Sequence, residues 1–196
     1  IVGGMPAAVV SYLKRNNLQD VINSQKEIIR LYRKDISQYD SERQLNIKDV
    51  FDLIPSELNS KSKRFFIKSL DEKARAEMFK NEFLWLKDAG VAIPVFNVEE
   101  PKLPLKLASS RNLFKLFSND VGLLASQYSE GVQLKILTGN DAINFGSIYE
   151  NVVAQELLAH GFEELYYYNS KKMGEVDFVV EYQGEVFPIE VKSGKD

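Results

Sequence analysis

Apolar residues recur at three- and four-residue spacing over the first part of the chain, which is the period of amphipathic helices. This pattern predicts helix over residues 5–33, in two pieces that a polar break at Asn16-Asn17 separates. A further apolar stretch from Ile47 to Leu53 predicts a short helix. We expect Pro55 to end it, because proline removes a backbone donor from a helix.

A longer helix is predicted between Ser69, a suitable N-cap, and Gly90, a suitable residue just beyond its end. The period then changes. Residues Val91–Val98 and Leu113–Phe117 are rich in β-formers and predict a hairpin. A helix followed by a hairpin is typical of the end of a winged-helix domain.

The predicted hairpin carries only basic charges over residues 101–115. They are Lys102, Lys106, Arg111 and Lys115. One interpretation is that these side chains contact a phosphate backbone, as the wing of a DNA-binding domain commonly does. The alternative is a solvated hairpin whose edge lysines deter aggregation.

The first region is predicted to end in a short helix with Asp120 as its N-cap, and a polar linker over residues 126–146 follows it. An amphipathic helix is predicted over residues 147–160. Three strand-like runs follow it, at residues 165–168, 175–182 and 185–192. The element order is therefore αβββ.

The last two strands are predicted to form a hairpin around a two-residue turn at Gln183-Gly184. In that register Asp177 lies directly opposite Glu190, and Lys192 points to the same face. The other face is apolar, with Phe178 opposite Ile189. The hairpin is thus expected to have one core face and one charged face.

Like charges directly opposite one another destabilise a sheet, so the pair Asp177/Glu190 calls for a cation, a shared proton or exposure to water. Two carboxylates beside a lysine are what a divalent-metal site for phosphodiester hydrolysis requires. The alternative is a solvated sheet face in which Lys192 pairs with Glu175 and Glu190 is hydrated.

These residues also carry a resemblance. Asp177 and Glu190-Val191-Lys192 resemble the D…(D/E)-x-K signature of the PD-(D/E)XK nuclease superfamily, and residues 149–157 resemble its first core helix, with Glu150 as the acidic residue. The resemblance implies Mg²⁺ or Mn²⁺ held by Asp177, Glu190 and the Val191 carbonyl. It further implies that Lys192 orients the attacking water or offsets charge in the transition state, and that Glu150 tunes the metal through a water molecule.

Short motifs over nearly the whole chain fall in the order of a domain of unknown function that follows the ATPase core in a prokaryotic AAA-type ATPase family. They are Gly3-Gly4-Met5-Pro6, residues 115–124, residues 150–154, residues 175–178 and residues 189–192. The resemblance implies an ATPase domain upstream of Ile1. No phosphate-binding G-x-x-x-x-G-K-[ST] loop occurs in these 196 residues.

The amino-acid composition limits the kinds of protein and of site that this chain can form. The 44% apolar content is ordinary for a globular protein, and the absence of cysteine excludes disulfides and thiolate zinc sites. No bilayer-spanning run or signal segment is visible, so we expect a cytoplasmic protein with no membrane partner. Ile1 is not an initiator methionine, which favours a fragment. Residues 150–196 carry 4 basic against 10 acidic residues, which counts against this part gripping DNA alone.

The sequence thus predicts an α+β chain with a helical, winged-helix-like region (1–125), a linker (126–146) and a C-terminally truncated, restriction-endonuclease-like αβββ core (147–196). The favoured function is a metal-dependent nuclease or nuclease-derived DNA-processing module, working as the C-terminal part of an ATPase. Two alternatives remain: a non-catalytic module that binds DNA or protein for the ATPase, and a platform for homo-oligomerisation through the exposed sheet edge.

Overall fold

The computed structural model describes residues 1–38, 41–70, 79–138 and 145–192. The helices, in chain order, are α1 (Pro6–Arg15), α2 (Leu18–Ile36), α3 (Ser41–Asn59), the 3₁₀ turn η1 (Ile67–Ser69), α4 (Lys80–Asp88), α5 (Leu105–Ala108), α6 (Val121–Ser126), α7 (Glu130–Leu137) and α8 (Phe145–Ala159). None of the described helices is long and apolar enough to cross a lipid bilayer.

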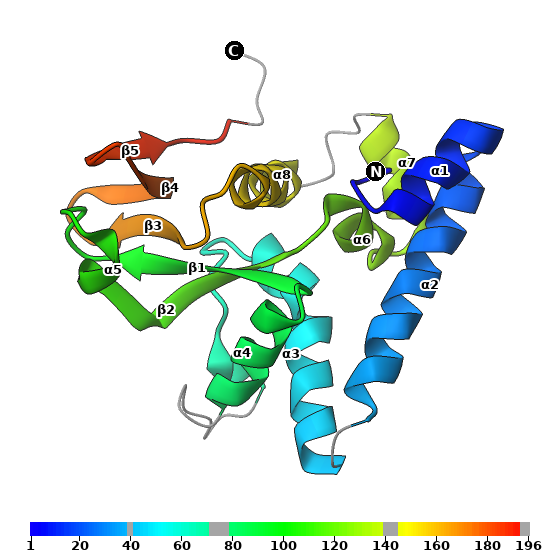
Figure 1. Cartoon of the computed structure of the whole chain (residues 1–196), viewed down its shortest axis with the longest axis horizontal. Helices are drawn as coiled ribbons and strands as arrows, with labels where there is room; N and C mark the ends of the chain where they lie inside the picture. Colours follow the sequence, from blue (N-terminus) through cyan, green and yellow to red (C-terminus); the bar gives the residue numbers. More distant parts are fainter. Residues whose placement is uncertain (39–40, 71–78, 139–144, 193–196) are drawn as a thin grey trace.

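Five strands form one sheet, and the fold is mixed α+β (Figure 1). The strands are β1 (Ala92–Val98), β2 (Ser109–Ser118), β3 (Leu165–Ser170), β4 (Gly174–Tyr182) and β5 (Glu185–Ile189). Their order in the sheet is β2-β1-β3-β4-β5, so β2 and β5 are the edge strands. Neighbouring strands are antiparallel except β1 and β3, which run parallel.

Both halves of the chain contribute to this sheet. Strand β1 pairs with β3 through a register that includes Val95 opposite Leu165. The main hydrophobic core likewise contains residues of both halves, among them Phe117 of β2 and Phe178 of β4, whose ring centroids are 5.7 Å apart. The sequence interpretation separated a winged-helix-like hairpin from the later strands. In the structure that hairpin extends the same sheet, and the predicted linker contains α7.

The predicted division of the first helical region is confirmed. Asn16 ends α1 in the left-handed conformation, with φ of 47°. The side chain of Asn17 then accepts a hydrogen bond from the backbone N–H of Gln19 and caps α2. Two consecutive asparagines therefore end one helix and begin the next.

The prediction that Pro55 ends the third helix is wrong, because α3 continues through Pro55 to Asn59. A proline inside a helix costs roughly 3 kcal/mol. Ile54 and Leu58, on either side of it, are completely buried in the core. Burying two such side chains stabilises by about 3–6 kcal/mol, which is enough to carry the helix past the proline.

The boundaries of the fourth predicted helix are described only in part. Residues 71–78, where it should begin after Ser69, lie outside the described residues. Its end is confirmed: Gly90 follows α4 with φ of +65°, and its N–H donates to the Lys87 carbonyl.

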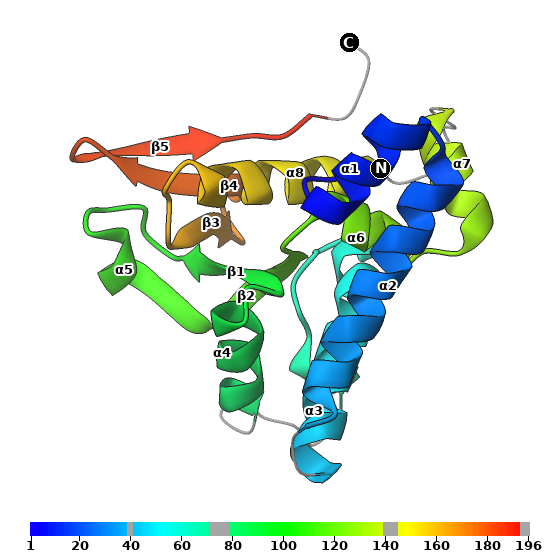
Figure 2. The ribbon, with the colours of Figure 1, turned by 45° about the vertical axis from the view of Figure 1, so that its right-hand side comes forward.

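Helix α8 lies beside the sheet and contacts β2, β3 and α6 (Figures 1 and 2). Figure 2 shows α8 running alongside β3 and β4, with α6 and the N-terminal segment near its far end. This placement brings α8 side chains against strands from both halves of the chain.

Candidate functional site

The β4–β5 hairpin has the predicted turn and register. Gln183 and Gly184 have φ of 51° and 77°, as a type I′ turn requires. Residue pairs then run from Tyr182 opposite Glu185 to Phe178 opposite Ile189. Phe178 is completely buried, and Ile189 packs against the same core.

A β-bulge in β4 changes the direction of Asp177. Tyr166 pairs with Val179 and Tyr168 with Val176, so β4 has one residue more than β3 between these pairs. Asp177 and Phe178 therefore both lie opposite Tyr167. Phe178 packs on Phe117, and an Asp177 carboxylate oxygen lies 4.0 Å from the Lys115 ammonium. Because Lys115 and Phe117 share a face of β2, Asp177 and Phe178 both point toward α8, and the prediction that they face opposite sides is wrong.

The ladder between β4 and β5 stops just before the predicted pair of acids. The Val191 N–H donates to the Asp177 carboxylate at 2.9 Å. Glu190 is exposed and accepts a hydrogen bond from the ammonium of Lys192 at 2.6 Å. The structure therefore places Glu190 and Lys192 together in solvent, while Asp177 turns into the protein.

The buried centre of the site is Lys115. Its side chain is 0% exposed, and its Nζ atom lies 2.7 Å from a Glu175 oxygen and 3.4 Å from a Glu150 oxygen. The ammonium also stands over the ring of Tyr167, 5.0 Å from the centroid. Strands β2, β3 and β4 and helix α8 each provide one or more of these groups.

A second lysine reaches the same carboxylates from the loop after α3. The Lys63 ammonium forms an ion pair with Glu150, on the oxygen that Lys115 does not contact. The loop is fixed nearby, because the Phe65 N–H donates to the Phe114 carbonyl at 2.9 Å and the two rings stack. Lys63 itself has φ of 50°, a left-handed conformation that costs a non-glycine residue about 1–2 kcal/mol. Its backbone is thus held in an unfavourable conformation where its side chain meets Glu150.

Burial is the largest influence on the pKa of two groups at the site. It raises the pKa of Glu150, although the two lysines oppose that effect. Burial also raises the pKa of Tyr167 to about 12. Two ammonium groups thus meet three carboxylates, those of Glu150, Glu175 and Asp177.

The donor set does not fit the Mg²⁺ or Mn²⁺ that the nuclease resemblance implies. Both Glu150 oxygens and one Asp177 oxygen lie near ammonium groups, and the other Asp177 oxygen accepts from Val191. Mg²⁺ needs oxygen ligands at about 2.0–2.1 Å, a space that Lys115 fills. Within the described part of the chain, no three His, Cys, Asp or Glu side chains are grouped so as to hold a metal ion.

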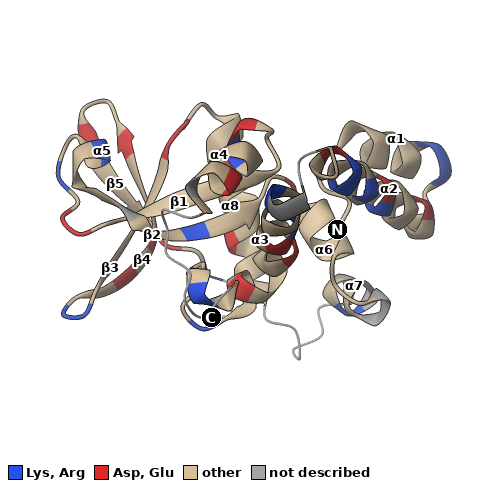
Figure 3. Ribbon diagram, turned by 90° about the horizontal axis from the view of Figure 1, so that it is seen from below, with Lys and Arg blue, Asp and Glu red and all other residues tan. Residues whose placement is uncertain are grey.

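Three of the four residues predicted to bind nucleic acid are described with their side chains, and these three do not form a basic surface. Lys102 pairs with Glu100 at 2.7 Å and Lys106 with Glu164 at 2.8 Å. Lys115 is buried, which is incompatible with phosphate contact in this conformation. The Arg111 side chain lies outside what the structure describes. Figure 3 shows acidic and basic residues interspersed along α2 and α3.

A hydrogen-bonded strap formed by residues 1–5 lies against the start of α6 and against Gln155 of α8. The Gly4 N–H donates to Asp120 at 2.6 Å, and Asp120 also caps α6 by accepting from the Leu123 N–H at 2.9 Å, which confirms the predicted N-cap. A Cβ atom added to Gly122 would lie 2.7 Å from the Val2 carbonyl oxygen, so only glycine leaves room for the strap. The motifs that prompted the ATPase-family resemblance thus converge in space around α8.

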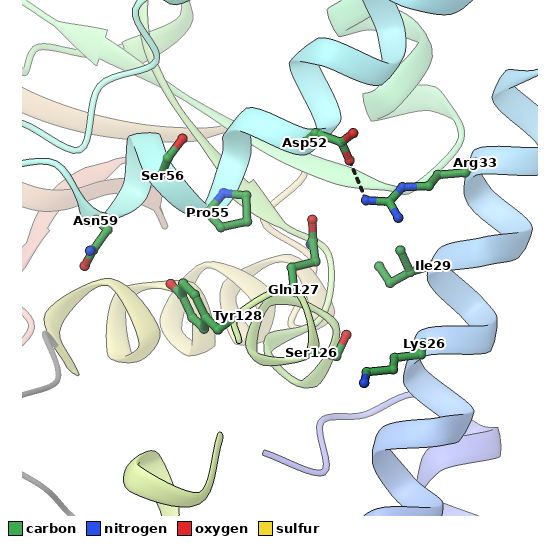
Figure 4. A pocket seen from close by; sticks show the side chains of 10 residues that line it. All are labelled: Lys26, Ile29, Arg33, Asp52, Pro55, Ser56, Asn59, Ser126, Gln127 and Tyr128. Atoms are coloured by element: carbon green, nitrogen blue, oxygen red, sulfur yellow. Dashed lines mark hydrogen bonds and ion pairs between the residues drawn. The ribbon is translucent and has the colours of Figure 1, made fainter. Parts of the chain in front are cut away.

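A pocket of about 690 Å³ lies between α2, α3 and the end of α6 with the two residues after it (Figure 4). Arg33 and Asp52 form an ion pair across it at 2.8 Å. Because this arginine is already paired, the pocket offers less charge to a ligand than its composition suggests.

Sequence reasoning identified Glu150 and Asp177 but missed the roles of Lys115, Lys63 and Glu175. Lys115 did leave a signal, because it is a single cation within the apolar run from Leu113 to Phe117 and a buried lysine must be paired. Lys63 left none, since it is one of several lysines in a polar stretch.

Two family models match the chain. Residues 1–133 match Domain of unknown function (DUF8612), and residues 145–196 match Domain of unknown function (DUF4143). No curated protein matches the chain, and no solved structure does. The boundary between the two matches passes through the site, because Lys63 and Lys115 belong to the first match and the three carboxylates to the second. Since the first match covers more than half of the chain, the protein belongs to the DUF8612 family.

Proposed function

We propose that this chain is a non-catalytic, nuclease-derived module that binds protein in the service of an AAA-type ATPase. The observation that carries the proposal is the buried Lys115 ammonium among Glu150, Glu175 and Asp177. A phosphodiester-cleaving site needs a divalent cation there, with an open position for water and phosphate. The ammonium of Lys115 lies where such a cation would sit between these carboxylates.

Descent from a nuclease is supported by the order of the secondary-structure elements and by the positions of two acidic residues. Helix α8 and strands β3, β4 and β5 follow the αβββ order of the resemblance. Glu150 and Asp177 lie near each other around Lys115, as the acidic residues of that core should. Glu190 and Lys192, the remaining signature residues, lie in solvent.

The link to an ATPase is supported by the second family match. Domains of that family are commonly associated with AAA-type ATPases. Protein is favoured over nucleic acid as the partner, because Lys102 and Lys106 are paired with acids and Lys115 is buried.

A cleavage assay tests the proposal. The full-length protein is incubated with plasmid and single-stranded DNA in millimolar Mg²⁺ or Mn²⁺, beside the Asp177→Ala and Glu190→Ala variants. We expect all three proteins to leave both DNAs intact. Cleavage by the wild type that either substitution abolishes would restore the nuclease interpretation.

A binding assay tests whether the partner of this module is a protein or a nucleic acid. Fluorescence anisotropy with labelled duplex and single-stranded DNA should show no saturable binding by the full-length protein at moderate salt. Saturable binding that weakens in Lys102→Ala and Lys106→Ala would favour a DNA-binding module instead.

A further inference from the structure

The lysine–carboxylate cluster is a connection between the two family-matched regions. Lys63 and Lys115 come from residues 1–133, and Glu150, Glu175 and Asp177 come from residues 145–196. Every ion pair within the cluster therefore crosses the boundary between the matches.

We propose that Lys115 and Lys63 act as built-in cations that keep this cluster free of metal, and that the filled cluster locks the two regions together. This inference does not rest on the proposed function, because a non-catalytic module could still hold a metal ion or fold as two independent parts.

The first part of the proposal rests on the Lys115 ammonium, which occupies the space between the carboxylates. The Lys115 ammonium approaches Glu175 at 2.7 Å, the distance of a charge-assisted hydrogen bond, and lies over the Tyr167 ring. The bulge in β4 turns Asp177 toward this ammonium. Lys115 sits on the central part of β2, so it cannot withdraw unless that strand moves.

The second part of the proposal, that the cluster holds the two regions together, is supported by hydrogen bonds between α8 and the first region. The residue after Glu150, Asn151, bonds both backbone groups of Ser118: it accepts from the N–H at 2.9 Å and donates to the carbonyl at 3.0 Å. One turn further along α8, Gln155 accepts from the Val121 N–H at 3.0 Å. One face of α8 thus binds the end of β2 and the start of α6 in succession.

Thermal unfolding of the full-length protein tests both parts. Lys115→Met keeps the length of the side chain and removes its charge, leaving buried carboxylates without their partner. We expect the melting temperature, Tm, to fall by about 6–20 °C, the range for breaking a buried ion pair in a chain of this size. The matched control is Lys102→Met, an exposed lysine paired with Glu100, which should leave Tm nearly unchanged. A Lys115→Met protein as stable as the wild type would overturn the lock.

Glu175→Gln is a milder probe should Lys115→Met fail to fold, because the Glu175 side chain is 30% exposed. It should lower Tm, and hydrogen exchange should quicken in β2 and α8 together. Faster exchange in β4 alone would show that the cluster does not couple the regions.

The metal part is tested on the wild type alone. Its Tm should be the same in millimolar Mg²⁺, in millimolar Mn²⁺ and in chelator. A rise in Tm with Mn²⁺ that Asp177→Asn removes would show a metal site and overturn the built-in cation. That result would also remove the observation that carries the proposed function, and the cleavage assay would then decide whether the metal-bound protein is a nuclease.

Discussion

At the scale of residues, the decisive feature is a lysine whose charge is hidden. Lys115 is the one charged residue in the apolar run Leu113–Phe117 of β2, and burial of an unpaired ammonium is prohibitively costly. The protein therefore gathers carboxylates around it from α8 and β4. Two of the acids that the sequence suggests for a metal site, Glu150 and Asp177, are in the fold counter-charges of this lysine.

Glu150 should make stability depend on pH in a defined direction. Burial raises its pKa in the folded state above the ordinary value of 4.5. The folded state therefore holds this proton more tightly than the unfolded chain. The resulting contribution of Glu150 to the free energy of unfolding is present in full below the pKa that Glu150 has in the unfolded chain. It is lost as pH rises through the pKa that Glu150 has in the folded protein.

The measurement is urea unfolding of wild type and Glu150→Gln from about pH 4 to about pH 8. The free energy of unfolding of wild type minus that of the variant should fall as pH rises above 4.5 and then level off. A difference that grows with pH would mean that the folded protein favours the ionised form of Glu150.

At the scale of elements, turns and bulges decide which side chains meet. The β4–β5 turn fixes the register, whereas the bulge beside Tyr167 sends Asp177 inward. The Asp177 carboxylate then takes the Val191 N–H, which explains why β5 ends at Ile189 and not at Lys192.

The turn itself can be tested by substitution at Gly184. Its φ of +77° is costly for any residue with a Cβ atom, although no atom lies within 4 Å of the position where that Cβ would be. Gly184→Ala should therefore lower the free energy of unfolding by about 1–2 kcal/mol through backbone strain alone. Gln183→Asn should instead raise it by a few tenths of a kcal/mol, because asparagine tolerates positive φ. Urea unfolding measures both, and a neutral Gly184→Ala would argue against the type I′ turn.

At the scale of the whole molecule, two family-matched regions form one sheet and share one core. Strands β1 and β2 of the first region continue the sheet that β3, β4 and β5 of the second region form. Core residues such as Phe117 and Phe178 join across the boundary. The strands of the two regions are thus parts of a single sheet.

The protein should accordingly unfold in a single cooperative transition. The one tryptophan, Trp85, lies in α4 and reports on the first region by fluorescence, while far-UV circular dichroism reports on both regions. Urea curves from the two probes should coincide. Separate midpoints would indicate two independently folding domains.

The sequence by itself determined several helix ends and turns, because these depend on short-range rules. Asn16-Asn17, Asp120 and Gln183-Gly184 each set a helix end or a turn through their own backbone and side-chain chemistry. The αβββ order and the closeness of Glu150 to Asp177 were likewise predictable from spacing and resemblance.

Only the tertiary structure decided what occupies the site. Whether β1 and β2 form a separate wing or extend the sheet depends on long-range pairing with β3, which no local pattern encodes. A one-residue bulge moved Asp177 to the other face of the sheet, and alternation along a strand cannot reveal such an insertion. The partner of the acids, Lys115, lies 35 residues from Glu150 in sequence. The cost of leaving its buried charge unpaired is what brings these residues together.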